Sequence, residues 1–295
     1  MVGMADIAVA RSVEELRERV DQWRRGSASR VALVPTMGAL HDGHLALIHR
    51  ARQIADRVVV SIFVNPTQFG VGEDFDTYPR TEDRDLALLA EVGGDLAYCP
   101  SAQSMYPEGF ATTISVSGPA RGLCAATRPQ LFDGVALVCT KLCLQCRPDV
   151  AVFGEKDYQQ VQVLRRLVAD LDIPVVIESV ATVREPDGLA MSSRNAYLDA
   201  GDRGRAASLY AVLARTAEAL SRHPDPPVEA IVDQARASLD GIFDAVDYCV
   251  LRDADTLTPV TALTRAARLL AAVHVGGTRL IDNVAVDPPD GSQEG

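Results

Sequence analysis

Two histidines, His41 and His44, stand three residues apart in the stretch "VPTMGALHDGHLALI" (residues 34–48), between an apolar run and a helical pattern. The first amides of a helix are unpaired and favour an anion, so imidazoles at this position could donate hydrogen bonds to phosphate oxygens. Two other interpretations stay open. The segment fits a surface loop that holds two histidines, or a zinc pair, although the spacing is not i,i+4 and no third ligand stands out.

A second group of donors occurs about 150 residues later, in "AMSSRN" (residues 190–195). Ser192, Ser193 and Arg194 can all donate to a polyphosphate, the arginine through its planar fork. Composition alone is also typical of a serine-rich surface turn. An early His-x-Gly-His and a late Met-Ser-rich loop together resemble the paired signature of nucleotidylyltransferases that act on the α-phosphate of ATP, a group that includes the class I aminoacyl-tRNA synthetases.

Three further polar side chains could serve the same pocket. Lys156 and Gln160 are four residues apart, and we expect them to share one face at the start of a helix. Lys156 could neutralise a phosphate, whereas Gln160 could present its amide to a polar substrate. Gln68 follows the apolar run at residues 57–64 and offers a second amide. A charged first turn with a solvated glutamine is the alternative interpretation.

The elements that carry these residues follow from periodicity. The sequence predicts strands at 30–35, 57–64, 95–100, 112–117, 149–154 and 174–180, and helices at 44–55, 81–92, 134–146 and 158–171, after a short N-terminal strand and a helix capped by Ser12 with Glu15. This alternation, with nearly all-apolar strands, favours an α/β class: a Rossmann-like parallel sheet covered on both faces. Ligands bind at the carboxyl ends of such strands, and each polar loop above follows one.

The pattern changes after residue 182. Helices are predicted at 202–222 and 227–240, then a strand at 246–253 and an antiparallel hairpin around Gly276 and Gly277. We expect a Rossmann-like domain at 1–182, which binds ATP and substrate, and a small α+β domain at 183–288 that closes over ATP. The ending "DPPDGSQEG" has the composition of a disordered tail, placed at 289–295.

Composition excludes several classes of function. The net charge is −11, from 29 basic and 40 acidic residues, so we expect no nucleic-acid partner. No apolar run approaches the roughly 20 residues that cross a bilayer, and no signal peptide is evident, so we expect a cytoplasmic protein with no membrane partner. Cys139, Cys143 and Cys146 repeat at the spacing of one apolar helix stripe. We therefore interpret the six cysteines as buried and reduced rather than as a redox or zinc motif.

Five motifs in order resemble the pantoate–β-alanine ligase (pantothenate synthetase) family: "VPTMGALHDGH", "VVVSIFVNPTQF", "YPRTEDRDL", "VFGEKDYQQ" and "GLAMSSRN". The resemblance implies a homodimer with a nucleotide fold like that of the class I synthetases. It implies two steps: pantoate attacks the α-phosphate of ATP to give pantoyl adenylate and pyrophosphate, and β-alanine then displaces AMP. Mg²⁺ would be carried mainly on the phosphates of ATP.

The resemblance also implies roles for single residues. His41, His44, Lys156 and Arg194 would stabilise the phosphates during transfer. The ATP-binding positions would be Met37, Gly38, Ala39, Leu40, His41, Asp42, Gly43, His44, Gly154, Glu155, Lys156, Asp157, Val183 (at the adenine), Met191, Ser192, Ser193 and Arg194. Gln68, Gln160, Pro35 and Met37 would hold pantoate or β-alanine. Asp85 matches an acidic position linked to magnesium in some relatives, but Arg84 and Leu88 stand beside it here.

One segment departs from the family pattern. Family members usually read Leu-Glu-Gly and then Arg-Pro-Gly-His-Phe, whereas this chain has Cys124 in place of the glutamate and Leu131 in place of the histidine, followed by Asp133. The segment flanks the pantoate side in relatives, so the departures bear on pantoate binding. The alternatives are an ATP-binding protein without turnover, or another adenylyltransferase with an impaired pantoate site. The acidic chain and its small C-terminal part disfavour a tRNA ligase.

Overall fold

The structure is a computed structural model that describes residues 7–27, 29–222 and 225–288. The chain divides into two compact units, which we describe separately. Unit 1 comprises residues up to 116 together with 128–155 and 163–181, and unit 2 comprises 117–127, 156–162 and the residues from 182 onward. Segments 117–127 and 156–162 therefore group with the C-terminal residues, although the sequence placed them in the first domain. The tail predicted at 289–295 lies outside the described residues.

Unit 1 is built on a six-stranded parallel sheet with the strand order β1-β4-β3-β2-β5-β6. Its strands are β1 (Ala8–Ala10), β2 (Val31–Thr36), β3 (Arg57–Ile62), β4 (Leu96–Tyr98), β5 (Val150–Gly154) and β6 (Val176–Val180). The helices that lie wholly or partly in this unit are α1 (Val13–Ser27), α2 (Asp42–Ile54), α3 (Glu82–Val92), α4 (Ala102–Met105), α6 (Leu131–Cys146) and α7 (Tyr158–Asp170). Short 3-10 turns η1 (Pro66–Gln68) and η3 (Glu155–Asp157) follow β3 and β5. The predicted α/β class is confirmed.

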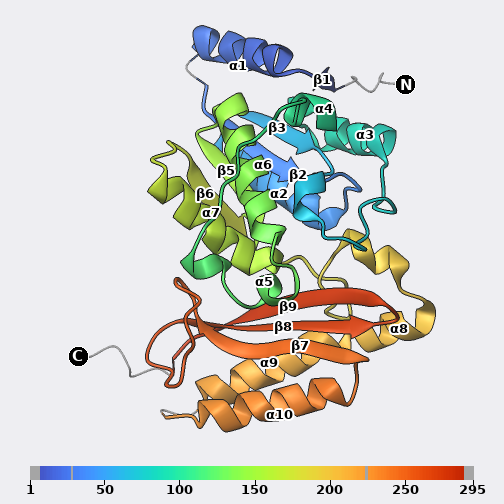
Figure 1. Ribbon diagram of the computed structural model, residues 1–295, viewed down its shortest axis with the longest axis vertical. Helices are drawn as coiled ribbons and strands as arrows, with labels where there is room; N and C mark the ends of the chain where they lie inside the picture. The colour runs from blue at the N-terminus through green and yellow to red at the C-terminus, as the bar shows by residue number, and fades with distance from the viewer. Residues whose placement is uncertain (1–6, 28, 223–224, 289–295) are drawn as a thin grey trace. The chain divides into compact units, whose positions relative to one another are not determined.

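Helices cover both faces of this sheet (Figure 1). On one face, α2 and α3 bury a cluster that includes Leu47, Ile48 and Leu89 against Val34 and Val60. On the other, α6 packs against β2 and against α1. Every residue of β2 from Val31 to Val34 is buried, because both sides of a central parallel strand are covered. The strand that carries the histidine loop is therefore held by packing on all sides.

Unit 2 contains a three-stranded antiparallel sheet, β7 (Ala245–Asp253), β8 (Ala267–Val275) and β9 (Thr278–Val286), in the order β7-β8-β9. Helices α9 (Ser208–Ser221) and α10 (Val228–Asp240) pack against the strands and against each other (Figure 1). The remaining elements are η2 (Gly118–Ala120), α5 (Cys124–Thr127), η4 (Ser193–Tyr197) and α8 (Ala200–Ala206). The predicted hairpin around Gly276 and Gly277 is confirmed as β8 and β9.

Two predicted elements were wrong. Residues 112–117 form no strand; most of their side chains are exposed, and their backbone pairs with no described strand. A short β-branched run becomes a strand only where a sheet accepts its backbone. The single helix predicted at 202–222 is divided at Ala207 into α8 and α9. Helix α8 contains Gly201 and Gly204, and glycine is a weak helix former.

The cysteine interpretation and the N-terminal cap are confirmed. All six cysteines are buried and free. Ser12 Oγ accepts a hydrogen bond from the Glu15 amide at 3.2 Å, and the Ser12 amide donates to Glu15 Oε2 at 3.3 Å. This reciprocal pair is a capping box at the start of α1.

Candidate active site

The carboxyl ends of four strands of unit 1 define the edge where the polar loops begin. Strands β3, β2, β5 and β6 are neighbours and parallel, and they end at Ile62, Thr36, Gly154 and Val180. The loops with His41, Gln68 and Glu155 leave from this edge. The loop with Ser192 to Arg194 belongs to unit 2. Unit 1 thus brings three of the four predicted loops to one edge of its sheet.

His41 and His44 form a capping box at the start of α2, made from two imidazole rings. His41 is the N-cap, and its Nδ1 accepts a hydrogen bond from the Gly43 amide at 3.1 Å. The His44 Nδ1 lies 3.4 Å from the His41 amide, which donates to it. A neutral imidazole whose Nδ1 accepts must carry its proton on Nε2. Both rings are therefore held in the tautomer that offers an Nε2–H donor at a helix N-terminus, where an anion is favoured.

The turn that leads to His41 is held by side chains of unit 1. Thr36 Oγ1 donates to the Ser61 carbonyl at 2.7 Å and accepts from the Gly38 amide at 3.2 Å. Gly38 has φ +79°, and a Cβ there would stand 3.0 Å from Asp85 Oδ2. Glycine is required at this position by both the backbone conformation and the close approach of the carboxylate.

Asp85 lies against this turn, in α3. Its carboxylate is buried and accepts from the amides of Ala39 and Leu40. No group of three or more His, Cys, Asp or Glu side chains that could hold a metal ion occurs among the described residues. The contacts of Asp85 are those of a residue that holds a loop, and its role as a magnesium ligand stays a prediction.

Gln68 is oriented by two neighbours from the same sheet edge. Its Oε1 accepts from Asn65 Nδ2 at 3.0 Å, and its Nε2 lies 3.3 Å from the Met37 sulfur. Pro35 belongs to the end of β2, two residues before Met37. Asn65 is the centre of this arrangement, because it is 1% exposed and also donates to the Gly134 carbonyl at 3.2 Å. The two predicted substrate residues Met37 and Gln68 are thus in contact.

Asn65 was not identified from the sequence, although it stands in the motif "NPTQF". Its Oδ1 accepts from Tyr106 Oη at 2.8 Å and from Thr67 Oγ1 at 3.0 Å. A buried amide with this many partners fixes the 3-10 turn η1. The signal that could have revealed it is an asparagine directly before proline at the end of an apolar strand.

Gly154 and Glu155 end β5 in unit 1. The Glu155 carboxylate accepts from Ser179 Oγ at 3.1 Å, and Ser179 Oγ accepts from Arg165 Nη2 at 3.2 Å. The glutamate of the motif "VFGEKD" is therefore part of a polar chain that joins the ends of β5 and β6. Gly154 lies beside α2, where a Cβ would meet only Leu47, at 3.9 Å.

Lys156, Asp157 and Gln160 belong to unit 2. Lys156 lies in the 3-10 turn η3 with its Nζ 3.7 Å from Asp157 Oδ2, and α7 begins only at Tyr158. The expectation that Lys156 lies in the first turn of the same helix as Gln160 was therefore wrong. Residues Glu155 to Asp157 of the motif form a short 3-10 turn between the end of β5 and the start of α7.

The loop with the second set of donors is anchored through Arg184. Its guanidinium forms a fork with Asp282 of β9, with Nη1–Oδ2 at 2.6 Å and Nη2–Oδ1 at 2.9 Å, and stacks over the Tyr210 ring at 3.8 Å. The Met191 amide donates to the Val183 carbonyl at 3.0 Å, which closes the loop on itself. Ser192 Oγ accepts from the Arg194 amide at 3.3 Å as the N-cap of η4. Ser193 is the first residue of η4.

The next residue of β9 holds Lys156. Asn283 Nδ2 donates to the Lys156 carbonyl at 3.0 Å, while Asp282 binds Arg184. Adjacent residues of one strand in unit 2 therefore hold both predicted phosphate-binding segments. Neither residue was singled out from the sequence; the available signal was a pair of polar residues inside the apolar stretch "LIDNVAV" of this strand.

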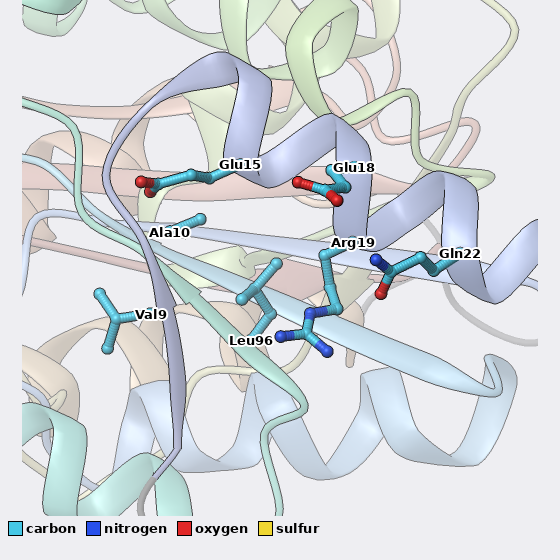
Figure 2. Close-up of a pocket in the computed structure, with 7 residues that line it drawn as sticks. All are labelled: Val9, Ala10, Glu15, Glu18, Arg19, Gln22 and Leu96. Atoms are coloured by element: carbon cyan, nitrogen blue, oxygen red, sulfur yellow. The ribbon is translucent and has the colours of Figure 1, made fainter.

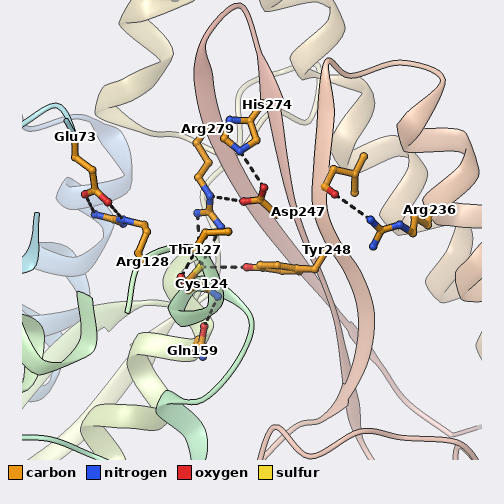
Figure 3. A network of polar contacts seen from close by, with 11 residues as sticks. Glu73, Cys124, Thr127, Arg128, Gln159, Arg236, Asp247, Tyr248, His274 and Arg279 are labelled. Atoms are coloured by element: carbon orange, nitrogen blue, oxygen red, sulfur yellow. Dashed lines mark hydrogen bonds and ion pairs between the residues drawn. The ribbon is translucent and has the colours of Figure 1, made fainter. Parts of the chain in front are cut away.

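The altered segment at residues 123–127 lies in unit 2, and Figure 3 shows its polar contacts. Cys124 Sγ, which stands where the resemblance predicts a glutamate, lies 3.2 Å from Tyr248 Oη and 3.7 Å from Arg279 Nη1. Arg279 Nε also donates to Asp247 Oδ2 at 2.8 Å. Gln159 accepts from the Cys124 amide at 3.1 Å. Burial of Tyr248 beside Cys124 raises the pKa of the phenol well above 10.

The second part of the altered segment, from Arg128 onward, lies in unit 1. Arg128 is paired with Glu73, with Nε–Oε1 at 2.7 Å, and its Nη2 donates to the Gln68 carbonyl at 3.2 Å. Leu131 is buried at the start of α6, and Asp133 is exposed in the first turn. Arg128 thus contacts the backbone of the predicted substrate residue Gln68.

A separate pocket of about 220 Å³ lies between α1 and the strands β1 and β4 (Figure 2). Its polar lining comes from Glu15, Glu18, Arg19 and Gln22. None of the predicted site residues lines it.

In the described part of the chain, no helix is both long and apolar enough to span a membrane.

Comparisons with known proteins agree with the motifs. The model of the pantoate–β-alanine ligase family matches residues 8–285. The pantothenate synthetase of Paramagnetospirillum magneticum is 54% identical over 96% of this chain and 99% of the relative. The pantothenate synthetase of Chelativorans sp. is 51% identical over 96% of this chain and 99% of the relative.

Solved structures agree as well. The crystal structure of pantothenate synthetase from Thermus thermophilus is 43% identical, with a TM-score of 0.90 over 96% of this chain and 100% of that one. Pantoate–β-alanine ligase from Francisella tularensis was solved in complex with β-γ ATP and β-alanine. It is 31% identical, with a TM-score of 0.77 over 98% of this chain and 99% of that chain. With its five motifs in order, its parallel sheet and these relatives over nearly its whole length, this chain belongs to the pantoate–β-alanine ligase family.

Proposed function

We propose that the chain condenses (R)-pantoate with β-alanine to pantothenate in two ATP-dependent steps, through a pantoyl-adenylate intermediate. The observation that carries this chemistry is the pair of Nε2–H donors that His41 and His44 offer at the N-terminus of α2. Such donors favour the charge that develops on an α-phosphate during transfer. The ligase class itself follows from the family.

In the first step, a carboxylate oxygen of pantoate forms a bond to the α-phosphorus, and the bond from that phosphorus to the bridging oxygen breaks. Pyrophosphate leaves with the electron pair. His41 and His44 stabilise the α-phosphate, and Lys156 and Arg194 neutralise the phosphates. No nucleophilic side chain is required, because the substrate supplies the attacking oxygen.

In the second step, the amine of β-alanine attacks the acyl carbon of pantoyl adenylate. The carbon–oxygen bond to the phosphoryl group breaks, AMP leaves, and the amine releases a proton as the amide forms. Gln68 and Gln160 hold the hydroxyl and carboxylate of pantoate, and Pro35 and Met37 hold pantoate or β-alanine. The fixed contacts of Gln68 with Asn65 and Met37 support this role, since an amide held from two sides is preorganised to bind.

The remaining ATP contacts are proposed for three segments and one single residue. Residues 37–44 line the α-phosphate, and Gly154 to Asp157 hold ribose and phosphate. Val183 lines the adenine, and Met191 to Arg194 bind the outer phosphates. Mg²⁺ enters with ATP, bound to its phosphates as part of the substrate. A cytoplasmic location and a homodimer complete the proposal; they rest on the family resemblance and on the sequence.

The experiment that tests the function measures pyrophosphate release with ATP and Mg²⁺, with and without D-pantoate, followed by addition of β-alanine. We expect release of pyrophosphate only when pantoate is present, then AMP and pantothenate after β-alanine is added. ATP binding without pantoate-dependent turnover would contradict the proposal. It would indicate that the altered segment around Cys124 has disabled the acceptor site.

A further inference from the structure

The carboxylate of Asp85 is fully buried and faces the backbone of the histidine loop. Its Oδ2 accepts from the Ala39 amide at 2.9 Å and its Oδ1 from the Leu40 amide at 2.8 Å. Thr81 Oγ1, one helical turn earlier, lies 3.2 Å from both oxygens. A charged acceptor with several donors makes strong hydrogen bonds in a buried site.

The loop needs this support because its backbone is unusual. Gly38 has φ +79° and Ala39 has φ +50°, so two consecutive residues are in the left-handed region. Alanine adopts that region only when its surroundings hold it there. The side chain of Leu40 is 1% exposed in the core of unit 1, which fixes the loop on its other side.

The arrangement also determines which groups can meet a phosphate. Consecutive amides in a left-handed turn often form an anion-binding concavity. Here the amides of Ala39 and Leu40 donate to the protein's own carboxylate. These two amides therefore hold the turn, and the place of the imidazoles of His41 and His44 depends on the peptide that Asp85 holds just before them.

We propose that Asp85 is a positioning residue of the ligase reaction: it holds the 38–40 turn so that the Nε2–H groups of His41 and His44 stand where the α-phosphate is transferred. This inference rests on the proposed function. It differs from a magnesium role, since it assigns the carboxylate oxygens to backbone donors and not to an ion.

The test is Asp85→Asn, made in the wild type and in a His44→Ala background. The amide keeps the shape of the carboxylate but must turn an NH₂ toward one of the two backbone donors. We expect kcat for pantoate-dependent pyrophosphate release to fall about a hundredfold, the usual cost of a misplaced catalytic group. In the His44→Ala background the further loss should be smaller, because only His41 is then left for the altered turn to misplace.

The matched control is Asp95→Asn in the same unit. Asp95 Oδ2 accepts from the Val58 amide at 2.9 Å and Oδ1 from Arg57 Nη1 at 2.8 Å, at the start of β3. It too is a carboxylate that accepts a backbone amide, but the amide belongs to a strand and lies at the amino end of the sheet. We expect Asp95→Asn to lower the melting temperature and to leave kcat unchanged.

Three outcomes would overturn the inference: an unchanged kcat in Asp85→Asn, an equal loss in both backgrounds, or activity restored by high Mg²⁺, which would make Asp85 a metal ligand. Should Asp85→Asn fail to fold, Thr81→Val removes one donor to the same carboxylate, and its loss of kcat should likewise shrink in the His44→Ala background. A wild type without pantoate-dependent turnover would contradict the proposed function instead. The affinity for ATP, measured by calorimetry, would then test the role of Asp85. We expect a weaker affinity in Asp85→Asn and an unchanged affinity in Asp95→Asn.

Discussion

The rings of His41 and His44 lie with their centroids 4.1 Å apart and their planes tilted by 39°. Each ring uses Nδ1 to accept a backbone amide at the start of α2. The two histidines of the family motif therefore cap the helix, and this capping sets the tautomer in which we propose that they bind the α-phosphate.

Substitutions of His44 test this relationship. We expect His44→Ala to lower kcat by about a hundredfold, since one well-placed donor is worth about 3 kcal/mol in the transition state. His44→Gln should retain more activity than His44→Asn, because the glutamine amide nitrogen falls near the position of Nε2 and that of asparagine near Nδ1. Steady-state kinetics measures the order, and thermal unfolding shows that the fold is kept. Equal activity of all three variants would contradict a role for Nε2–H.

Gly134→Ala tests how α6 supports the substrate side. A Cβ at Gly134 would stand 2.3 Å from the Thr67 carbonyl oxygen and 2.6 Å from the Gln68 amide nitrogen, which are backbone atoms of η1. We expect this overpacking to cost about 1–3 kcal/mol of stability, although alanine favours helices. The displaced Gln68 should raise KM for pantoate more than KM for ATP. A pantoate KM equal to that of the wild type, measured well below the melting temperature, would show that Gln68 does not depend on this contact.

Asn283→Ala tests the attachment of Lys156 to β9. The change removes the hydrogen bond to the Lys156 carbonyl, so we expect KM for ATP to rise up to about tenfold, the worth of one hydrogen bond. The control is Thr216→Val, which removes a buried 2.8 Å hydrogen bond to the Val212 carbonyl within α9 of the same unit. The control should lose stability and keep its KM for ATP. Parallel changes of KM in both variants would indicate a general loosening of the unit.

The buried cysteines should be unreactive in the native protein. Burial raises the pKa of Cys99 to about 11 and that of Cys143 to about 12. The pKa values of Cys139 and Cys146 are raised further by the same cause. We expect these thiols to react slowly with a disulfide reagent at pH 8 and rapidly after unfolding, since the thiolate is the reactive form. Rapid oxidation of Cys143 with Cys146 in the folded protein would revive the redox interpretation.

The same shifts predict a loss of stability at alkaline pH. Burial also raises the pKa of Cys249 to about 12, against a usual value of 9.0. A group whose folded-state pKa is raised contributes its full stability below the unfolded pKa and loses it as the pH rises through the folded value. We expect the melting temperature to fall between about pH 9 and pH 12, and Cys249→Ala to reduce this dependence. Calorimetry across that range measures it; a slope that no cysteine variant alters would assign the effect to other groups.

Local pattern alone predicted much of this protein. The alternation of buried strands with amphipathic helices specified the parallel sheet, because strand and helix periodicities are properties of short windows of sequence. The loops with His41, Gln68 and Glu155 could be placed at one sheet edge, because carboxyl ends of parallel strands meet there. The motifs were enough to recognise the family. They were not enough to show that the imidazoles cap a helix.

The tertiary structure decided the contacts between residues that are far apart in the chain. Asp85 holds the amide of Leu40 across 45 positions, and Asn283 holds the carbonyl of Lys156 across 127. Residues 112–117 look like a strand by composition but receive no partner among the described strands. Strand pairing and buried acceptors depend on which surfaces folding brings together, and no local window of sequence contains that information. For this reason the sequence named the groups that we propose to meet ATP, and only the fold revealed the residues that hold them in place.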